Sequence, residues 1–468
     1  MKSMGHFHRL LGYLNAVHVV RNTRLISRAS NAVSVPPDLY DALESSELKH
    51  RRHPGIRSHK RTSLPPKLLE AVKTVLETRD VRQLREGATV LRAQLWSRHL
   101  PVEADTIRQK AAFLERQLLP DQLESMSPEE RDQVEEQVKA AVLKKLRHET
   151  YHWKAFNYDE FGSGAYLVAR LAADYAALNR IFSEIKHLNQ TFVPKTVMDF
   201  GSGVGTVFWA VQDLWPRKLG EYFSVDASAH MNALARLLVQ GGDPNGNVKL
   251  QAYFQRQFLP ASDKIKFDLV VSAFSLMELP SMKQRLETVA NLWAKTSGML
   301  VLVENGTLAG HRAISEARDF ILTMASHSQT EEGNVVKEAH ILAPCPHDQE
   351  CPRNMEKVKV PCNFAVEYDD SIFSEKKNKG QTLYSYTVIQ KSSTISEERH
   401  WPRIINPVLC RSRHVICRLC CDDGNLKEIV LSKKRNGRHA YRIARCSNWG
   451  DQLPLDILPE GNSCSEKG

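Results

Sequence analysis

From Thr196 onward, segments typical of buried strands alternate with segments of helical spacing, and this alternation constrains the fold more than any other feature. TVMDF and EYFSVD are short strand-like segments, while KFDLVVSAF and GMLVLVEN are near-continuous apolar runs, as expected for strands covered on both faces. TVFWAVQDLW and SMKQRLETVANLWAK lie between them and carry apolar residues at helical spacing. The pattern predicts a doubly wound α/β sheet over residues 191–395.

A glycine-rich loop, MDFGSGVGT, joins the first of these strands to the helix that follows. Glycine lets the backbone turn sharply and approach a ligand closely. The carboxylate of Asp199 stands before the loop, where it would repel a pyrophosphate and suit a cationic amino-acid group. The second strand ends in Asp226, which can accept hydrogen bonds from ribose hydroxyls. Together these residues resemble the S-adenosylmethionine site of class I (Rossmann-type) methyltransferases. The expected cofactor-binding residues are Asp199, Gly201, Ser202, Gly203, Gly205 and Asp226; the alternative is a degenerate fold that binds no ligand there.

The end of the fourth strand, SAFSLMELP, does not contain the groups that methyl transfer would need. It has no Asn/Asp-Pro-Pro-aromatic element and no Pro-Cys pair. Ser272, Ser275 and Glu278 are the polar candidates, and Glu278 is better suited to capping a helix start than to acting as a base. The sequence therefore predicts how a cofactor is held and names no catalytic residue.

The chain before this core divides into a leader and a helical region. Residues 1–35 contain several arginines, an amphipathic apolar face and no acid before Asp38, which predicts a mitochondrial transit peptide. Apolar residues at three- and four-residue spacing predict an α-helical domain over 65–190, with Ser127 and Pro128 starting one of its helices. No apolar run is long enough to span a membrane, and no membrane partner is expected.

Positive charge is concentrated near the end of the chain. The net charge is +10, and between His400 and Cys446 eleven Lys and Arg stand against three acids. Strand-like pieces around the turns DDGN and RNG predict a small basic β extension over 400–455. Trp401 and Tyr441 lie among the charges, which favours a nucleic-acid surface over a merely solvated basic face. The candidate RNA-binding residues are Arg411, Arg413, Lys433, Lys434, Arg435, Arg438 and Arg442.

All nine cysteines lie after residue 344, and three of them occupy a proline-rich loop over 341–365. In a reducing compartment such thiols favour metal ligation over disulfides. The loop supplies Cys345, Cys351 and Cys362, and a fourth ligand must come from elsewhere; the tail offers Cys410, Cys417, Cys420 and Cys421. Cys417 and Cys420 with Cys345 and Cys351 could form a zinc site, with His347 in reserve. Spacing alone leaves open a zinc site and an iron–sulfur cluster. Cys446 and Cys464 are better explained as incidental thiols.

Several blocks in order resemble the mitochondrial small-ribosomal-subunit methyltransferase-like family over about residues 90–455. They are YHWKAFNYDEFGSGAYLVARL, MDFGSGVGT, SAFSLMELP, LVLVENGTLAGH, LAPCPHDQECP and HWPRIINPVLCRSRHV. The resemblance implies a mitochondrial matrix protein that binds small-subunit rRNA and assembly intermediates or ribosomal proteins, and does not bind DNA. It also implies a 4Fe-4S cluster held by Cys345, Cys351, Cys362 and Cys420, with Cys420 the least secure of the four.

The resemblance further implies that S-adenosylmethionine binding is retained and methyl transfer lost. The prediction is therefore an rRNA-binding assembly factor rather than an enzyme. Two alternatives stay open: an active S-adenosylmethionine-dependent rRNA methyltransferase, and a permanent mitochondrial ribosomal protein.

Overall fold

The computed structural model describes residues 33–57, 61–120, 126–151, 153–262, 264–326, 338–370, 372–373, 378–392 and 401–457. The leader predicted over residues 1–35 lies outside them except for Val33–Val35, and Cys464 also lies outside them.

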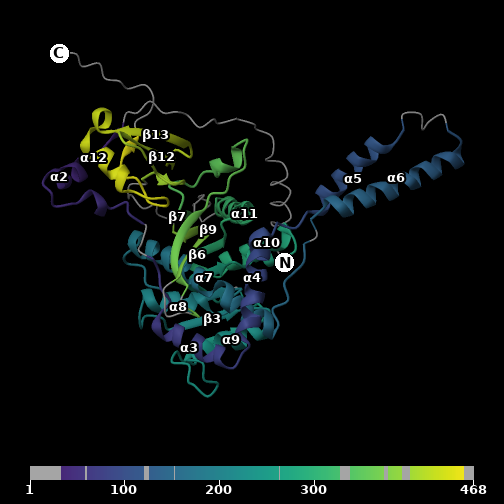
Figure 1. Cartoon of the computed structure of the whole chain (residues 1–468), viewed down its shortest axis with the longest axis horizontal. Helices are drawn as coiled ribbons and strands as arrows, with labels where there is room; N and C mark the ends of the chain where they lie inside the picture. Colours follow the sequence, from purple (N-terminus) through teal and green to yellow (C-terminus); the bar gives the residue numbers. More distant parts are fainter. Residues whose placement is uncertain are drawn as a thin grey trace, which may run out of the picture.

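An eight-stranded mixed sheet forms the centre of the molecule (Figure 1). Seven strands follow the order β4-β3-β2-β5-β6-β9-β7, and β8 pairs with β9. The strands from β2 to β6 run parallel, whereas β9 runs antiparallel to β6, β7 and β8. Because β7 and β8 both pair with β9, the cysteine-rich loop between them leaves and re-enters the sheet beside the same strand. The bounds are β2 Thr196–Phe200, β3 Glu221–Val225, β4 Ala252–Arg256, β5 Phe267–Ala273, β6 Thr296–Asn305, β7 Ala339–Ala343, β8 Phe364–Asp370 and β9 Asn378–Lys391.

Helices cover both faces of the sheet, so the predicted doubly wound α/β arrangement is confirmed. In β2, Val197 joins the apolar cluster that contains α7, α8 and α9, while Met198 joins the cluster with α10 and α11. Successive strand residues face opposite sides, and here both sides are apolar, which explains the near-continuous hydrophobic runs. The bounds are α7 Glu160–Leu188, α8 Thr206–Leu214, α9 Ala229–Val239, α10 Met282–Ala294 and α11 Leu308–Ala325.

The helices predicted over 65–190 are present, but most of them share the core of the sheet. Leu68 of α3 (Pro66–Glu77) and Leu84 of α4 (Val81–Ser97) belong to the same buried cluster as Val197. The long helix α7 packs against both α4 and α8, so it is buried around most of its circumference. Among the described helices, α7 included, none has the length and apolarity needed to cross a membrane.

Two helices form an arm that projects from this body (Figure 1). α5 (Ala104–Leu118) and α6 (Pro128–Glu149) pack against each other around a small cluster of Leu114, Val138 and Val142. The predicted start of α6 is confirmed, because Pro128 is its first residue and Ser127 and Glu130, on either side of that position, form a capping box.

The end of the chain forms a second body together with residues from the beginning of the chain. β1 (Val33–Ser34) pairs with β14 (Asp456–Ile457), and Leu39 and Leu43 of α2 (Pro37–Glu44) enter the core formed by the C-terminal residues. Figure 1 shows α2 beside α12. We call residues 401–457 together with 33–57 the C-terminal module. Its other elements are η1 His50–Arg52, β10 Arg403–Ile404, β11 Leu409–Cys410, β12 His414–Cys420, β13 Leu426–Ser432 and α12 Lys433–Cys446.

The small basic β extension predicted over 400–455 is β-structured only in part. The strands on either side of the DDGN turn are confirmed as the hairpin β12–β13. The RNG segment, however, lies inside α12, where Gly437 (φ 80°) interrupts the helical backbone. Ser432 caps this helix by accepting a hydrogen bond from Arg435 N at 3.3 Å, and Ala440, Ile443 and Ala444 bury its apolar face. The charged residues at the start of α12 mask this amphipathic spacing in the sequence.

Candidate functional site

The glycine loop follows β2 and leads directly into α8, as the sequence predicts. Gly201, Gly203 and Gly205 have φ values of 68°, 50° and 77°, a region that favours glycine. At Gly201 a Cβ atom would lie 2.3 Å from Cβ of Ser275, so the loop also passes too close to the end of β5 for a side chain. The loop therefore requires glycine for its conformation and, at Gly201, for space.

Asp226 follows β3 and holds the loop in place. Its Oδ2 accepts a hydrogen bond from Gly203 N at 2.8 Å, and its Oδ1 accepts one from Ser228 N at 2.9 Å. Burial raises the pKa of Asp226, although these two backbone donors oppose the rise. Each oxygen of a carboxylate can accept a second hydrogen bond, so the residue could also receive ribose hydroxyls.

Asp199 lies fully buried in β2 at the base of the same loop. Its Oδ2 accepts a hydrogen bond from the Tyr222 hydroxyl at 2.5 Å, while its Oδ1 has no partner among the described residues. Burial raises the pKa of Asp199 to about 7, the negative charge of Asp226 adds to the rise, and the Tyr222 bond opposes it. A cationic ligand group beside Asp199 would favour the ionised form.

Asp199, Gly201, Ser202 and Gly203 line a pocket of about 280 Å³, part of which is open to solvent. Gly205 and Asp226 do not line it, and Asp226 reaches the loop only through its hydrogen bond from Gly203 N. It lies where the strand order reverses between β2 and β5, the usual ligand position in open α/β sheets. Ser202 Oγ lines this pocket and, like Asp199 Oδ1, is buried without a partner among the described residues. Two unmet polar atoms in one pocket fit a polar ligand such as the amino-acid part of S-adenosylmethionine.

The opposite wall comes from α7 and was not predicted. Tyr166 and Arg170 both bind Asp174, which is buried, and the Arg170 guanidinium lies 4.9 Å from the centre of the Phe274 ring. A charged pair four residues apart in an otherwise apolar helix is the signal in the sequence that could have identified this wall.

The polar candidates at the end of β5 are all engaged in structural contacts. The hydroxyls of Ser272 and Ser275 bind each other at 2.7 Å, and Ser275 also donates to Phe200 O. Glu278, in η3 (Leu276–Glu278), accepts from Arg98 at 2.6 Å and from Tyr158. These contacts connect the end of β5 to β2 and to the chain around Arg98 and Tyr158.

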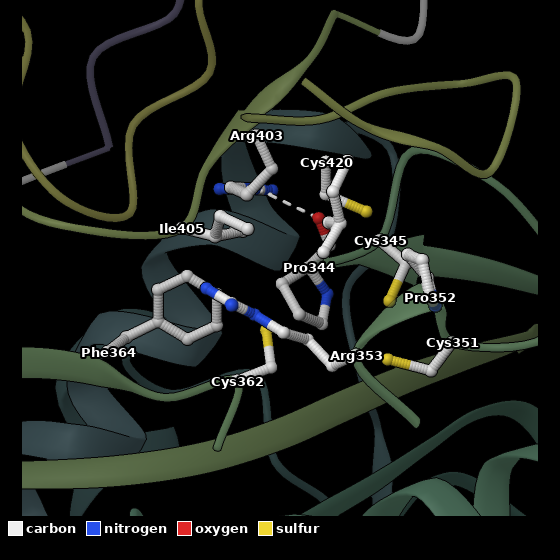
Figure 2. Close-up of a pocket in the computed structure, with 11 residues that line it drawn as sticks. Pro344, Cys345, Cys351, Pro352, Arg353, Cys362, Phe364, Arg403, Ile405 and Cys420 are labelled. Atoms are coloured by element: carbon white, nitrogen blue, oxygen red, sulfur yellow. Dashed lines mark hydrogen bonds between the residues drawn. The ribbon is translucent and has the colours of Figure 1, made fainter. Parts of the chain in front are cut away.

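The four cysteines predicted as ligands line a single cavity of about 290 Å³, part of which is open to solvent (Figure 2). Cys345 follows β7, Cys351 precedes η4 (Pro352–Met355), Cys362 precedes β8, and Cys420 ends β12. Three of them therefore come from the loop beside β9 and the fourth from the C-terminal module. We call this space the thiol cavity.

Strand alternation explains which tail cysteine reaches the thiol cavity. Val415, Cys417 and Leu419 of β12 point into the apolar core of the C-terminal module, and Cys421 lies in that core too. Cys420 points the other way and lines the cavity. Its Sγ lies 3.3 Å from Nε2 of His347.

The four thiols of the thiol cavity are soft donors of the kind that bind zinc or iron–sulfur centres. Among the described residues, however, no set of three or more His, Cys, Asp or Glu is arranged to hold a metal ion. Burial raises the pKa of Cys351 to about 12 and raises those of Cys362 and Cys420, so the thiols would need a bound metal to ionise.

Arg403 joins the thiol cavity to the rest of the fold. The fully buried guanidinium donates to Pro344 O at 2.9 Å, to Gly450 O at 2.7 Å and to Glu184 Oε1 of α7 at 2.5 Å. Burial alone would raise the pKa of Glu184, but Arg403 and Arg180 lower it to about 2. The sequence gives no sign of this contact, which joins residues 219 positions apart.

The seven candidate RNA-binding residues are all exposed in the C-terminal module. Arg411 and Arg413 lie between β11 and β12, and the other five lie on α12. The two groups meet where Arg445 of α12 donates to Arg411 O at 3.0 Å.

Comparison with known proteins gives relatives along most of the chain. A human protein, "Ribosome assembly protein METTL17, mitochondrial", is 42% identical over 87% of this chain and 86% of its own length. "Ribosome assembly protein RSM22, mitochondrial" of Saccharomyces cerevisiae is 23% identical over 42% of this chain and 45% of its own length. Among solved structures, magnesium protoporphyrin IX methyltransferase from Synechocystis with bound SAM covers 54% of this chain and 96% of its own, with 11% identity and a TM-score of 0.28.

The family model described as "Mitochondrial small ribosomal subunit Rsm22" matches residues 161–454, which hold the sheet, both pockets and most of the C-terminal module. With this match over more than half of the residues and the human relative covering most of both sequences, the chain belongs to the mitochondrial Rsm22 family.

Proposed function

We propose that this protein is an assembly factor of the mitochondrial small ribosomal subunit that works in the matrix as an RNA-binding scaffold and not as an enzyme. One observation carries the proposal: the thiol cavity lies where the cysteine-rich loop meets the module that presents the basic residues. The human and budding-yeast relatives are both named ribosome assembly proteins, which supports the same role here.

The residues of the thiol cavity would hold a 4Fe-4S cluster through Cys345, Cys351, Cys362 and Cys420. When bound, such a cluster supplies four strong metal–sulfur bonds that join separate chain segments. Cys420 belongs to the hairpin β12–β13, whose end continues directly into α12. Closing the four thiols around one centre would therefore restrain the basic surface relative to the sheet, and metal-binding energy would become folding energy.

The basic surface would contact small-subunit rRNA through its phosphates. The seven exposed Arg and Lys residues come from one helix and one adjoining loop, so they can follow a single stretch of backbone. Arginine and lysine contacts to phosphates position a protein without reading sequence. Neighbouring ribosomal proteins or assembly intermediates would supply the remaining specificity.

The glycine-loop pocket would bind S-adenosylmethionine without transferring its methyl group. Asp199 and Ser202 would receive the amino-acid part, and Asp226 the ribose. Because Ser272, Ser275 and Glu278 are engaged with neighbouring residues, the cofactor would act as a structural ligand that stabilises the glycine loop.

Anaerobic purification of the protein and of two alanine variants tests the proposal. Cys351→Ala removes a cavity thiol, while Cys417→Ala removes an equally buried thiol that faces the core of the C-terminal module. We expect Cys351→Ala to lose iron, acid-labile sulfide and co-sedimentation with small-subunit precursors, and Cys417→Ala to retain all three. If an iron-free Cys351→Ala protein still co-sedimented fully with small-subunit precursors, the proposed coupling between the cluster and the RNA surface would be refuted. If the parent protein contained zinc and no acid-labile sulfide, the thiol cavity would be a zinc site and not a cluster site.

Two further measurements distinguish the scaffold from an active rRNA methyltransferase and from a permanent mitochondrial ribosomal protein. An active rRNA methyltransferase predicts a modified nucleotide that disappears in Asp199→Asn, whereas a scaffold leaves rRNA modification unchanged. A permanent ribosomal protein would sediment with translating ribosomes as well as with precursors.

A further inference from the structure

Three arginines surround the thiol cavity. Arg353 and Arg403 line it directly. Arg318 of α11 donates to His347 O at 2.9 Å and to Gln349 O at 2.8 Å, and so holds the loop between Cys345 and Cys351. The three guanidiniums come from a helix, from the cysteine-rich loop and from the C-terminal module, which are distant in sequence and converge only here.

These guanidiniums are buried, and two of them have unmet donors. The side chains of Arg318 and Arg353 are 3% and 7% exposed. The Nε–H groups of both have no hydrogen-bond partner among the described residues. A buried donor left unpaired costs about 1–3 kcal/mol. One of these donors belongs to a residue that lines the cavity and the other to a residue that holds its loop, so an anion bound between the thiols would lie near both guanidiniums.

Each of the three guanidiniums also has a carboxylate partner. Arg318 pairs with Asp319, Arg353 with Glu356, and Arg403 with Glu184. Glu184 is shared with two further buried arginines, Arg57 and Arg180. One carboxylate therefore serves three buried guanidiniums at the Arg403 side of the cavity.

We propose that Arg318, Arg353 and Arg403 are positioning residues that balance the negative charge of a metal centre bound by the four cavity thiolates. The inference rests on the proposed function, since neutral thiols would need no such balance. Four thiolates outweigh the charge of a divalent ion, so a centre of this kind is anionic. Buried cations and hydrogen bonds near the sulfurs stabilise it and tune its reduction potential.

Arg353 is the residue of choice for a test. Arg403 also holds Glu184 and Gly450, so its loss would disturb the fold at several points. Arg353 donates to Glu356 at 2.7 Å and to Asn406 Oδ1 at 2.6 Å. A purely structural Arg353 would act through these two contacts, and then Glu356→Gln should be nearly as harmful as Arg353→Met. A charge-balancing Arg353 predicts the opposite, because Glu356→Gln removes a competing negative charge.

The experiment compares metal loss to a chelator and, for an iron-containing centre, the reduction potential, in the anaerobically purified full chain. We expect Arg353→Met to lose metal roughly 10–100 times faster than the parent protein and to have a lower potential. In both readouts Arg353→Lys should lie between the parent protein and Arg353→Met. Glu356→Gln should have a higher reduction potential than the parent protein and should not lose metal faster. The control Arg285→Met removes a similarly buried arginine that pairs with Glu316 in the α10–α11 contact, and it should leave both readouts unchanged.

Unchanged metal retention and potential in Arg353→Met would overturn this inference and leave the proposed function intact. If Glu356→Gln lost metal as fast as Arg353→Met does, the charge-balancing role would also be overturned, in favour of a structural role for Arg353. A parent protein that binds no metal at its thiols would instead overturn the proposed cluster, and the charge-balancing role with it.

Discussion

Replacing Glu184 by Gln is expected to destabilise the protein strongly, because this carboxylate is the counter-charge for three buried guanidiniums. Arg403 lies 2.5 Å from Glu184, Arg180 lies 3.4 Å away and Arg57 lies 3.9 Å away, and the Tyr386 hydroxyl donates to the same carboxylate. Glutamine has nearly the same shape, so the substitution removes the charge and creates little empty space.

The size of the expected loss of stability follows from the pKa of Glu184. This pKa falls from the ordinary 4.5 to about 2 in the folded protein. A shift of that size corresponds to about 3 kcal/mol of folding free energy in the ionised state, at ~1.4 kcal/mol per unit. This agrees with the roughly 3–5 kcal/mol that is lost when one partner of a buried ion pair is removed.

The stabilising contribution of Glu184 should depend on pH. Because folding depresses the pKa of Glu184, its contribution is complete above pH 4.5 and is lost as the pH falls from about 4.5 towards about 2. The stability difference between the parent protein and Glu184→Gln should therefore be constant from pH 8 to pH 5 and should narrow below that.

Denaturant unfolding at several pH values measures this difference, and limited proteolysis shows whether residues 401–457 are released first. The control is Glu86→Gln, which breaks an exposed ion pair with Arg82 and should cost at most about 0.5 kcal/mol. Equal stability of the parent and Glu184→Gln at pH 7, or a difference that does not shrink in acid, would refute the assignment of Glu184 as the buried counter-charge.

Three further outcomes are expected. Gly201→Ala should abolish S-adenosylmethionine binding in calorimetry because of the clash at the end of β5, whereas Gly241→Ala, at a similar positive φ with open space around it, should not. Replacing the three basic residues 433–435 by Gln should lower the slope of log K for single-stranded RNA against log salt by roughly 2, at ~0.7 per phosphate contact. Leu39 is only 5% exposed in the core of the C-terminal module, so Leu39→Ala should lower the free energy of unfolding by roughly 2–5 kcal/mol. It should also make residues 401–457, at the opposite end of the chain, accessible to protease.

The sheet and the glycine loop could be predicted from the sequence because their signals are local. A strand buried on both faces shows as a continuous apolar run, and a backbone at positive φ beside a close neighbour requires glycine, as at Gly201. The turn signal of Asn436-Gly437 is correct locally, because the backbone breaks at Gly437 (φ 80°). The helical pieces on either side of it were missed because their buried residues, Ile443 and Ala444 among them, pack against distant parts of the chain.

The thiol cavity could be predicted only in part. Spacings within the loop do not determine where Cys345 and Cys362 meet, because their positions depend on β7 and β8 both pairing with β9. The choice of Cys420 over Cys417 was accessible in principle, since Val415, Cys417 and Leu419 form an alternating apolar face that leaves Cys420 on the other side. The surrounding arginines were not accessible, because a charged residue in a sequence gives no sign that it will be buried.

The position of residues 33–57 changes how the C-terminal module should be understood. Its core contains Leu39 and Leu43 from the beginning of the chain, and β1 closes it by pairing with β14. The stacked rings of His50 and His439 join the same two regions, and Glu44 binds His439 on its other nitrogen. The basic surface on α12 is therefore joined to the rest of the molecule in two places: the thiol cavity with the adjoining Arg403–Glu184 contact, and the N-terminal segment. Since the N-terminal segment does not touch the thiols, loss of a metal centre should loosen this surface without unfolding it, and its effect on RNA association should exceed its effect on global stability.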